Sequence, residues 1–345
     1  MSVHPREQIS SLPAYRPGKS APIKLASNEN PNAPLPSVIE AIAIAAGGIN
    51  RYPDNGASAL VDALCAKYDV KPEQVAYGCG SVTVCEQIIQ GYAGDGDNVV
   101  HAWRSFEAYP LITEIVGVGA HRIPLREHTH DLDAMLAAID DRTRVVIVCN
   151  PNNPTGTAVG EEELTAFLDA VPSHVLVVLD EAYTEYVADG SVPDGVRLMR
   201  GRPNVCVLRT FSKAYGLAGL RVGYLIAEDP AVAEVVRKTM MPFSVSSIAQ
   251  AAAVASLEAD AELRERVTET VAERDRVSTA LRELGHEIPD SHANFVWLPL
   301  GEQTDEVAAR LAASGIMGRP FSGEGMRVTI GSREENDALI AALTP

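Results

Sequence analysis

Continuous apolar runs that alternate with helical patterns limit the folds open to this chain of 345 residues. The runs Arg144–Cys149 and His174–Leu179 contain VVIVC and VLVVL, in which apolar residues follow one another without polar positions between them. Strands of this kind are typical of sheets that helices cover on both faces. One intervening segment has apolar residues at the spacing of a helix face: Cys85, Ile88, Ile89 and Tyr92. The pattern predicts an α/β fold with a mixed or mostly parallel sheet.

The pattern changes after residue 243. Six short apolar runs before this point are candidate strands: Gln74–Tyr77, Asn98–His101, Arg144–Cys149, His174–Leu179, Val205–Leu208 and Val222–Ile226. Residues Ser244–Leu284 have the pattern of one long, alanine-rich helical stretch, and two more candidate strands follow at Asn294–Leu298 and Met326–Ile330. A final helix begins with Ser332 and Glu335 in capping-box spacing.

This change predicts three parts. The first is an N-terminal arm over residues 1–27, which contains several prolines and should be extended. A large domain over residues 28–243 carries the mostly parallel sheet, and a smaller α+β domain spans residues 244–345.

Charge and hydropathy exclude several classes of partner. With 29 basic and 46 acidic residues, the net charge is −17, which argues against nucleic acid because phosphate binding needs basic surface. No apolar run approaches the ~20 residues needed to span a bilayer, so no membrane partner is expected. Met1–Ser20 lacks the apolar core of a secretory signal, and we expect a cytoplasmic protein.

No metal site is expected. The five cysteines match no zinc spacing and are interpreted as small apolar residues in a reducing compartment. His128 and His130 lie in the polar segment Arg126–Asp131, which is interpreted as a solvated loop without a carboxylate partner for a metal.

Polar motifs follow three of the predicted strands. They are Asn150-Pro-Asn-Asn-Pro-Thr-Gly156, Asp180-Glu-Ala-Tyr183 and Arg209-Thr-Phe-Ser-Lys213. Taken singly, each has a structural explanation: a turn-rich loop, an Asp180 helix cap or a surface lysine. Because open α/β sheets bind ligands at the carboxyl ends of their strands, the three motifs together predict a site with an amide, a carboxylate and an amine.

A fourth motif, Gly78-Cys-Gly-Ser-Val-Thr83, lies between a predicted strand and a helix. Its glycines allow close approach of an anion, Ser81 can cap the helix, and free N–H groups at the helix start favour phosphate. A dehydrogenase fingerprint fits poorly, since the third glycine is missing. All four motifs fit pyridoxal phosphate, which needs an amine, a carboxylate for its ring nitrogen, partners for its phenolic oxygen and an anion cup.

The same residues carry a family resemblance. Asn150–Gly156, DEAY at Asp180–Tyr183, and Thr210-Phe-Ser-Lys213 with Arg221 resemble the fold-type I, aspartate aminotransferase-like pyridoxal-phosphate enzymes. Within them the chain is similar to the histidinol-phosphate and aromatic amino-acid aminotransferases, from Leu25–Asn30 to Arg327–Ile330.

The resemblance implies a role for each matching residue. Lys213 forms the Schiff base with the cofactor and moves the proton, Asp180 pairs with the ring nitrogen, and Tyr183 bonds the phenolic oxygen. Asn153 shares that oxygen and borders the substrate, and Phe106 stacks on the ring. The phosphate cup comprises Gly80, Ser81, Val82, Thr210, Ser212 and Arg221. Tyr52 matches a tyrosine that reaches the phosphate of a neighbouring subunit, which implies a homodimer with composite active sites; an aromatic residue of a turn before a proline is an equal alternative.

Two substrates are open within the resemblance, both exchanged with 2-oxo acids. For histidinol phosphate, Arg319 and Arg327 would clamp the substrate phosphate. For phenylalanine or tyrosine with 2-oxoglutarate, Arg327 alone takes the α-carboxylate, and aromatic residues line an apolar pocket: Tyr15, Phe106, Tyr109 and Phe321. The stretches Trp103–Pro110 and Ala293–Pro299 look more like the aromatic branch, which we favour, although Gly318 departs from the larger residue that the family often has there.

Two other functions remain as alternatives. A non-catalytic regulator built on this fold would usually carry a basic DNA-binding module, and the chain has no such region. A lyase or decarboxylase uses the same cofactor. Arg327 favours transamination, because the α-carboxylate of a dicarboxylic co-substrate must also dock.

Overall fold

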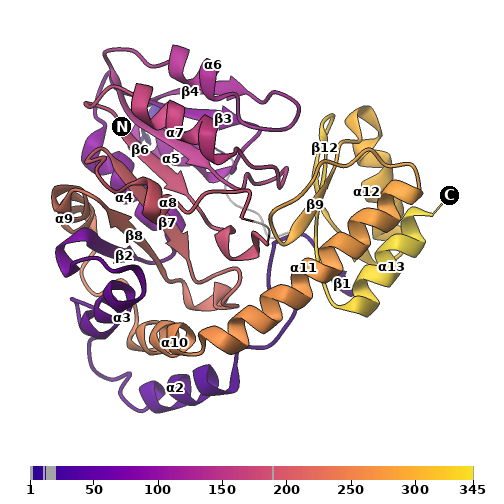
Figure 1. Cartoon of the computed structure of the whole chain (residues 1–345), viewed down its shortest axis with the longest axis horizontal. Coiled ribbons are helices and arrows are strands. Elements are labelled where there is room, and N and C mark those ends of the chain that lie inside the picture. Colours follow the sequence, from indigo (N-terminus) through magenta and orange to yellow (C-terminus); the bar gives the residue numbers. More distant parts are fainter. Residues whose placement is uncertain (1–2, 11, 13–20, 189, 345) are drawn as a thin grey trace.

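The protein, seen in a computed structural model, is described over residues 3–10, 12, 21–188 and 190–344. A larger lobe surrounds the main sheet, and a smaller lobe contains the C-terminal strands and helices (Figure 1). Helix α11 (Asp260–Glu283) runs from the larger lobe to the smaller one.

The larger lobe is organised around a seven-stranded sheet with the order β2-β8-β7-β6-β5-β3-β4. Only β8 runs antiparallel to its neighbours, so the sheet is mostly parallel. The strands are β2 (Val75–Gly78), β3 (Asn98–Trp103), β4 (Gly119–Pro124), β5 (Thr143–Cys149), β6 (Leu176–Asp180), β7 (Val205–Thr210) and β8 (Gly223–Ala227). The predicted α/β class is confirmed.

Helices cover both faces of this sheet, as the continuous apolar runs require. Val145 and Ile147 of β5 pack in one core with α4 (Ser81–Tyr92), α5 (Ala108–Val116) and α9 (Pro230–Thr239). Val146 and Val148 point the other way, into a second core. That core includes residues of α2 (Pro36–Ala46), α3 (Ser58–Tyr68), α6 (Leu132–Ala137), α7 (Glu161–Ala170), α8 (Gly195–Leu198) and α10 (Ser247–Glu258).

The six predicted strands of this sheet are present, with ends that differ by no more than two residues. Strand β4 is absent from the predictions. It lies at the sheet edge, where its residues are exposed or half-buried, and its sequence GAHRIP ends in proline. An edge strand needs no continuous apolar run, so the pattern that identifies the central strands misses it.

The smaller lobe has a three-stranded antiparallel sheet in the order β11-β12-β9. Its strands are β9 (Phe295–Leu298), β11 (Arg319–Phe321) and β12 (Gly325–Thr329). Side chains alternate: Val296, Leu298 and Val328 enter a core with α11, α12 (Thr304–Ala313) and α13 (Arg333–Leu343). The opposite face carries Trp297 and Arg327, which are paired across β9 and β12. This face is turned toward the larger lobe, where Arg327 meets Asn153.

The N-terminal segment joins both lobes. Glu7–Ser10 form the short helix α1, so this part of the predicted arm is not extended, and α1 packs on α5. Strand β1 (Ile23–Lys24) pairs in parallel with β10 (Ile316–Met317), and Leu25 enters the core of the smaller lobe.

The predicted helical stretch after residue 243 consists of two helices. Ala259 separates α10 from α11. Helix α10 packs against α2 and α3, and its buried Ala249, Ala252 and Ala253 belong to the core of the larger lobe. We therefore propose that the larger unit extends to Ala259 and not only to residue 243. No helix of the described residues is long and apolar enough to cross a membrane.

The predicted capping box of α13 is present. Ser332 Oγ accepts the Glu335 N–H at 3.3 Å, and Glu335 Oε2 accepts the Ser332 N–H at 2.8 Å. Replacing Ser332 with Ala should lower the free energy of unfolding by about 1 kcal/mol, since a cap of this kind contributes roughly that much. Denaturant unfolding measures the change. Ser314→Ala is the control, because that hydroxyl makes only a weak, exposed bond to Arg310 O at 3.4 Å. Equal losses in the two variants would contradict a specific role for the cap.

Candidate active site

The carboxyl ends of β5, β6 and β7 meet at a cavity of about 300 Å³ between the two lobes. Most of the side chains predicted for the site line it. They are Ser81, Val82, Phe106, Asn153, Asp180, Tyr183, Thr210, Ser212, Lys213, Arg221 and Arg327. These residues come from six elements and the loops after them, so the cavity depends on the strand order of the sheet.

Asp180 is a buried carboxylate at the last position of β6. The Tyr109 hydroxyl donates to its Oδ2 at 2.6 Å, and no described group makes a hydrogen bond to Oδ1. Burial raises the pKa of Asp180 to about 6, against the lowering effects of the Tyr109 hydrogen bond, the Ala182 backbone N–H and the Lys213 charge. The chain turns into a short 3₁₀ segment after Asp180, so the helix-cap alternative is wrong. A free, buried carboxylate oxygen at a cavity suits a cationic or N–H partner.

The next residue, Glu181, has a different environment. Its Oε2 accepts hydrogen bonds from Arg209 Nε at 3.0 Å and Nη2 at 2.6 Å, and its Oε1 accepts the Gly195 N–H at 2.7 Å. Both side chains of this ion pair are buried. Of the two adjacent acids, Glu181 is therefore fully paired within the protein, whereas Asp180 has bonding capacity for a ligand.

Lys213 lies on the loop after β7. Its Nζ donates to Ser27 O at 3.3 Å and lies 5.8 Å from the centre of the Tyr183 ring. Burial lowers the pKa of Lys213 to about 7, and the positive charges of Arg327 and Arg221 act in the same direction. A neutral amine is a nucleophile and a proton acceptor, so this lysine is suited to both tasks.

The start of α4 forms an anion cup. Gly80 precedes the helix with φ +85°, and a Cβ atom there would lie 2.4 Å from Arg221 Nη2. A Cβ at Gly223 would meet the Ser81 N–H, also at 2.4 Å, so both glycines keep the approach to the helix start open. Ser81 is the first helical residue and makes no capping bond, which corrects the prediction that it caps α4. The Thr210 hydroxyl bonds Ser212 Oγ at 3.0 Å, and Ser212 Oγ accepts from Arg221 Nη1 at 3.5 Å, so both hydroxyls lie beside the arginine that borders this cup.

Arg327 closes the cavity from the smaller lobe. Its guanidinium donates to Asn153 Oδ1 and Ala26 O, each at 2.6 Å, and its buried Nε has no described partner. Asn28, which the predictions leave without a role, donates from Nδ2 to the Tyr183 hydroxyl at 2.9 Å. Asn28 belongs to the Leu25–Asn30 stretch that carries the family resemblance, but its role depends on how residues 21–30 cross between the lobes, which local patterns do not show.

Comparison with known proteins identifies the family. Residues 20–343 match the family described as aminotransferase class I and II. The chain belongs to this family. It is 58% identical to the aromatic amino acid aminotransferase of Thermobifida fusca, over 97% of this chain and 95% of that protein. It is 55% identical to the protein of the same name from Rhodococcus jostii, over 100% of this chain and 96% of that protein.

Solved structures of the family share the fold. The histidinol-phosphate aminotransferase of Sinorhizobium meliloti, in complex with pyridoxal-5′-phosphate, superposes with a TM-score of 0.92 at 30% identity, covering 100% of this chain and 97% of that one. An aspartate aminotransferase mutant from Thermus thermophilus has a TM-score of 0.85 at 23% identity, covering 99% and 98% of the two chains. The predicted resemblance to fold-type I aminotransferases is confirmed.

Several predicted residues of this aminotransferase lie away from the cavity lining. Tyr109 is buried beneath Asp180, so its assignment to the substrate wall is corrected: its ring packs in the helix-covered core and only its hydroxyl reaches the site. Phe321 packs on Trp297, with 5.5 Å between ring centres. Arg319 is half exposed and paired with Glu107. Tyr15 lies outside the described residues.

Tyr52 is 82% exposed and stacks on Phe243, with 4.7 Å between ring centres. Tyrosine is enriched at protein interfaces, so an exposed tyrosine is compatible with one. Its predicted contact with a neighbouring subunit stays a prediction.

The interpretation of the Arg126–Asp131 segment is wrong for one residue. His130 is buried, its Nε2 lies 3.1 Å from Asn152 Oδ1, and burial lowers its pKa to about 4. It is a neutral core histidine beside the Asn150–Gly156 loop. Within the described ranges, no three His, Cys, Asp or Glu residues gather closely enough to hold a metal ion.

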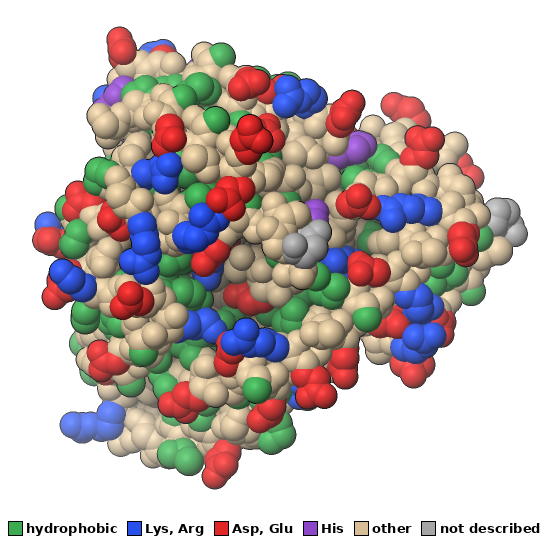
Figure 2. Space-filling model, in the orientation of Figure 1, with side chains coloured by type: hydrophobic (Ala, Val, Ile, Leu, Met, Phe, Trp, Pro, Cys, Tyr) green, Lys and Arg blue, Asp and Glu red, His purple; other side chains and the backbone are tan. Residues whose placement is uncertain are grey.

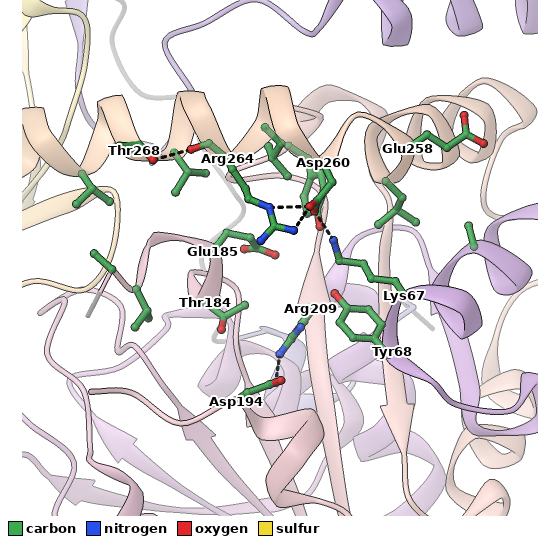
Figure 3. A pocket seen from close by; sticks show the side chains of 18 of the residues that line it. Lys67, Tyr68, Thr184, Glu185, Asp194, Arg209, Glu258, Asp260, Arg264 and Thr268 are labelled. Carbon is green, nitrogen blue, oxygen red and sulfur yellow. Dashed lines mark hydrogen bonds and ion pairs between the residues drawn. The ribbon is translucent and has the colours of Figure 1, made fainter. Parts of the chain in front are cut away.

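A larger cavity of about 1190 Å³ lies elsewhere, between α3, the 3₁₀ segment Thr184–Tyr186 and α11. Figure 2 shows this side of the molecule hollowed near its centre, with charged side chains around the hollow. In Figure 3, Lys67 and Arg264 both bond Asp260, and Arg209 bonds Asp194. Since Asp260 engages the amine of Lys67 and this lining has no glycine-bordered helix start, the smaller cavity is the better candidate site.

The lowered pKa of Lys213 gives a direct test. In cofactor-free protein, acetylation of Lys213 should reach half its limiting rate near pH 7, whereas an ordinary lysine titrates near ~10.4. Because the Arg327 charge lowers the pKa, Arg327→Leu should move the midpoint to higher pH. Mass spectrometry of the Lys213 peptide across the pH range measures both. A midpoint near that of an ordinary lysine would contradict the electrostatic account of this site.

Proposed function

We propose that this chain is a pyridoxal-phosphate-dependent aminotransferase of aromatic amino acids, with 2-oxoglutarate and glutamate as the exchanging pair. One observation carries the proposal: the same cavity is lined by Asp180, a buried carboxylate with one free oxygen, and by Lys213, an amine of lowered pKa. Family membership and relatives at 55–58% identity, each named aromatic amino acid aminotransferase, support the choice of activity.

The residues of the cavity fit pyridoxal phosphate. The free Asp180 Oδ1 suits the protonated ring nitrogen, and the glycine-lined start of α4 with Arg221 suits the phosphate. Phe106 lies in the lining, where it can stack on the ring, and Lys213 would hold the cofactor covalently. When bound, the cofactor supplies a carbonyl that exchanges the amino group and a ring that withdraws electrons from the substrate.

Asp180 is positioned to keep the ring nitrogen protonated. Its pKa of about 6 without a cationic partner falls when a positive charge approaches, because the ion pair favours the ionised carboxylate. Tyr109 fixes the orientation of the carboxylate from below, at 2.6 Å. Burial excludes water from this pair and so strengthens it.

Lys213 is positioned to carry protons. Its Nζ changes protonation near neutral pH, where an acceptor and donor of protons is most effective. Tyr183, whose hydroxyl accepts from Asn28, and Asn153, whose amide nitrogen is not used by Arg327, line the same cavity and can donate hydrogen bonds there. This arrangement supports proton transfer by Lys213 at the substrate α-carbon.

Arg327 is the proposed partner of the substrate α-carboxylate. It is nine-tenths buried, and its Nε is unpaired among the described residues, so an incoming carboxylate gains a charge-assisted bond without displacing an ion pair. We also propose that Tyr52 and Phe243 contact a second subunit in a homodimer. Their rings stack on each other and are exposed, and aromatic residues are enriched at protein interfaces.

Replacing Asp180 with Asn tests the carboxylate. The variant keeps the shape and the Tyr109 contact but removes the negative charge, so turnover should fall about 100-fold or more while the fold is unchanged. Steady-state rates and far-ultraviolet circular dichroism measure the two effects. Tyr109→Phe should lower turnover by a smaller factor, because the carboxylate stays ionised. Near wild-type rates for Asp180→Asn would leave this residue only a structural role.

A substrate panel tests the proposed activity. Holoenzyme is mixed with phenylalanine, tyrosine, histidinol phosphate or glutamate, and the change in cofactor absorbance is followed for each half-reaction. Phenylalanine and tyrosine should react with the highest kcat/KM, because an apolar ring gains from burial while a phosphate dianion loses hydration. A higher kcat/KM for histidinol phosphate would reverse the ranking, and release of CO₂ or of an eliminated group would favour the lyase or decarboxylase.

A further inference from the structure

Two arginines lie side by side on the face of the small sheet that is turned toward the cavity. Arg319 of β11 and Arg327 of β12 are direct partners in the antiparallel register. Residues opposite each other in such a pair have their Cβ atoms roughly 4.5–5.5 Å apart on the same face. The side chain of Arg319 therefore starts next to that of Arg327, although it does not line the cavity.

Glu107 holds Arg319 away from the cavity. Its Oε2 accepts from Arg319 Nη2 at 2.8 Å and from Nε at 3.2 Å, and its Oε1 accepts from Nη2 at 3.1 Å. Glu107 directly follows Phe106, which lines the cavity, and lies at the start of α5. The pair thus joins the loop under the proposed cofactor ring to the strand next to Arg327.

Both members of this ion pair act electrostatically on Arg327. Burial lowers the pKa of Arg327 and the Arg319 charge lowers it further, while Tyr183 and the Glu107 charge oppose them. The three groups therefore form one charge cluster. Two guanidinium groups and one carboxylate give this cluster a net charge of +1.

We propose that Glu107 determines substrate specificity by neutralising Arg319, so that this end of the site accepts one carboxylate and rejects a phosphate monoester. The inference rests on the proposed function. In histidinol phosphate, a phosphate ester replaces the α-carboxylate of an amino acid, so the phosphate must dock at Arg327. A phosphate monoester carries about −1.5 to −2 charges near neutral pH. It needs both arginines, and Glu107 both occupies Arg319 and repels the added charge.

The same interface contains a matched control. Arg104 forms an ion pair with Glu324, and Arg104 also stacks on Trp103 at 4.2 Å from the ring centre. Like Glu107–Arg319, this pair joins the loop after β3 to the β11–β12 hairpin. Glu324 is not among the groups that shift the pKa of Arg327. Loss of either pair weakens contact between the lobes, but only loss of the Glu107 charge changes the cluster at Arg327.

The test compares E107Q, E324Q and wild-type holoenzyme in half-reactions with phenylalanine and with histidinol phosphate. In E107Q, kcat/KM for histidinol phosphate relative to phenylalanine should rise about 10-fold or more, the effect of one charge-assisted hydrogen bond gained. The E324Q ratio should stay at the wild-type value. Inorganic phosphate should compete with phenylalanine more strongly in E107Q, which is a readout independent of turnover of the phosphate ester.

A double variant separates the charge from the packing. E107Q/R319A should lose the gain of E107Q, because the released arginine is then absent. The proposal is overturned if the E107Q ratio equals that of wild type, if E324Q shifts the ratio equally, or if the double variant keeps the gain. Each of these outcomes is a difference in the kcat/KM ratio between variants. Failure of the proposed function would instead appear as poor use of phenylalanine by the wild-type protein.

Discussion

The hydrogen bond from the Tyr109 hydroxyl satisfies one oxygen of the buried Asp180 carboxylate and leaves the other at the cavity. An ionised carboxylate without a partner is costly in a protein interior, which is why burial raises its pKa to about 6. The site is therefore incomplete without a positive or N–H group at Oδ1. Glu181, one residue on, shows the alternative, since Arg209 and Gly195 satisfy it within the protein.

Burial also determines the protonation of the other charged groups that line the cavity. Burial, with the positive charges of Arg327 and Arg221 added to it, lowers the pKa of Lys213 to about 7, so a neutral amine becomes accessible. Arg221 instead borders the anion cup at Gly80, where a Cβ would collide with it. Positive charge is thus concentrated at the two ends where substrate and cofactor anions are proposed to bind. The amine that must react lies between them.

Sequence patterns predict the parts of the site that depend on strand ends, and they fail where tertiary packing decides. Asp180 and Lys213 follow continuous apolar strands, and the sheet brings them to one cavity as expected. The resemblance places Tyr109 on the substrate wall, but an aromatic residue on α5 can face either the cavity or the core. Only the hydrogen bond from its hydroxyl to Asp180 shows that the ring lies in the core and the hydroxyl at the site. The importance of Glu107 is likewise invisible until β11 reaches it from 212 residues away.

The smaller lobe contributes to the chemistry through simple strand alternation. On β12, Val328 enters the apolar core, and Arg327 must therefore face the opposite way, toward the cavity. Antiparallel pairing places Arg319 beside it, and a Cβ at Gly318 would meet Met326 Sδ at 2.9 Å, which accounts for the small residue before Arg319. A pattern that stabilises the lobe thus brings two positive charges to the substrate end. Whether both remain available depends on the larger lobe, where Glu107 engages one of them. Substrate choice in this enzyme family member is then a property of the contact between lobes and not of either lobe alone.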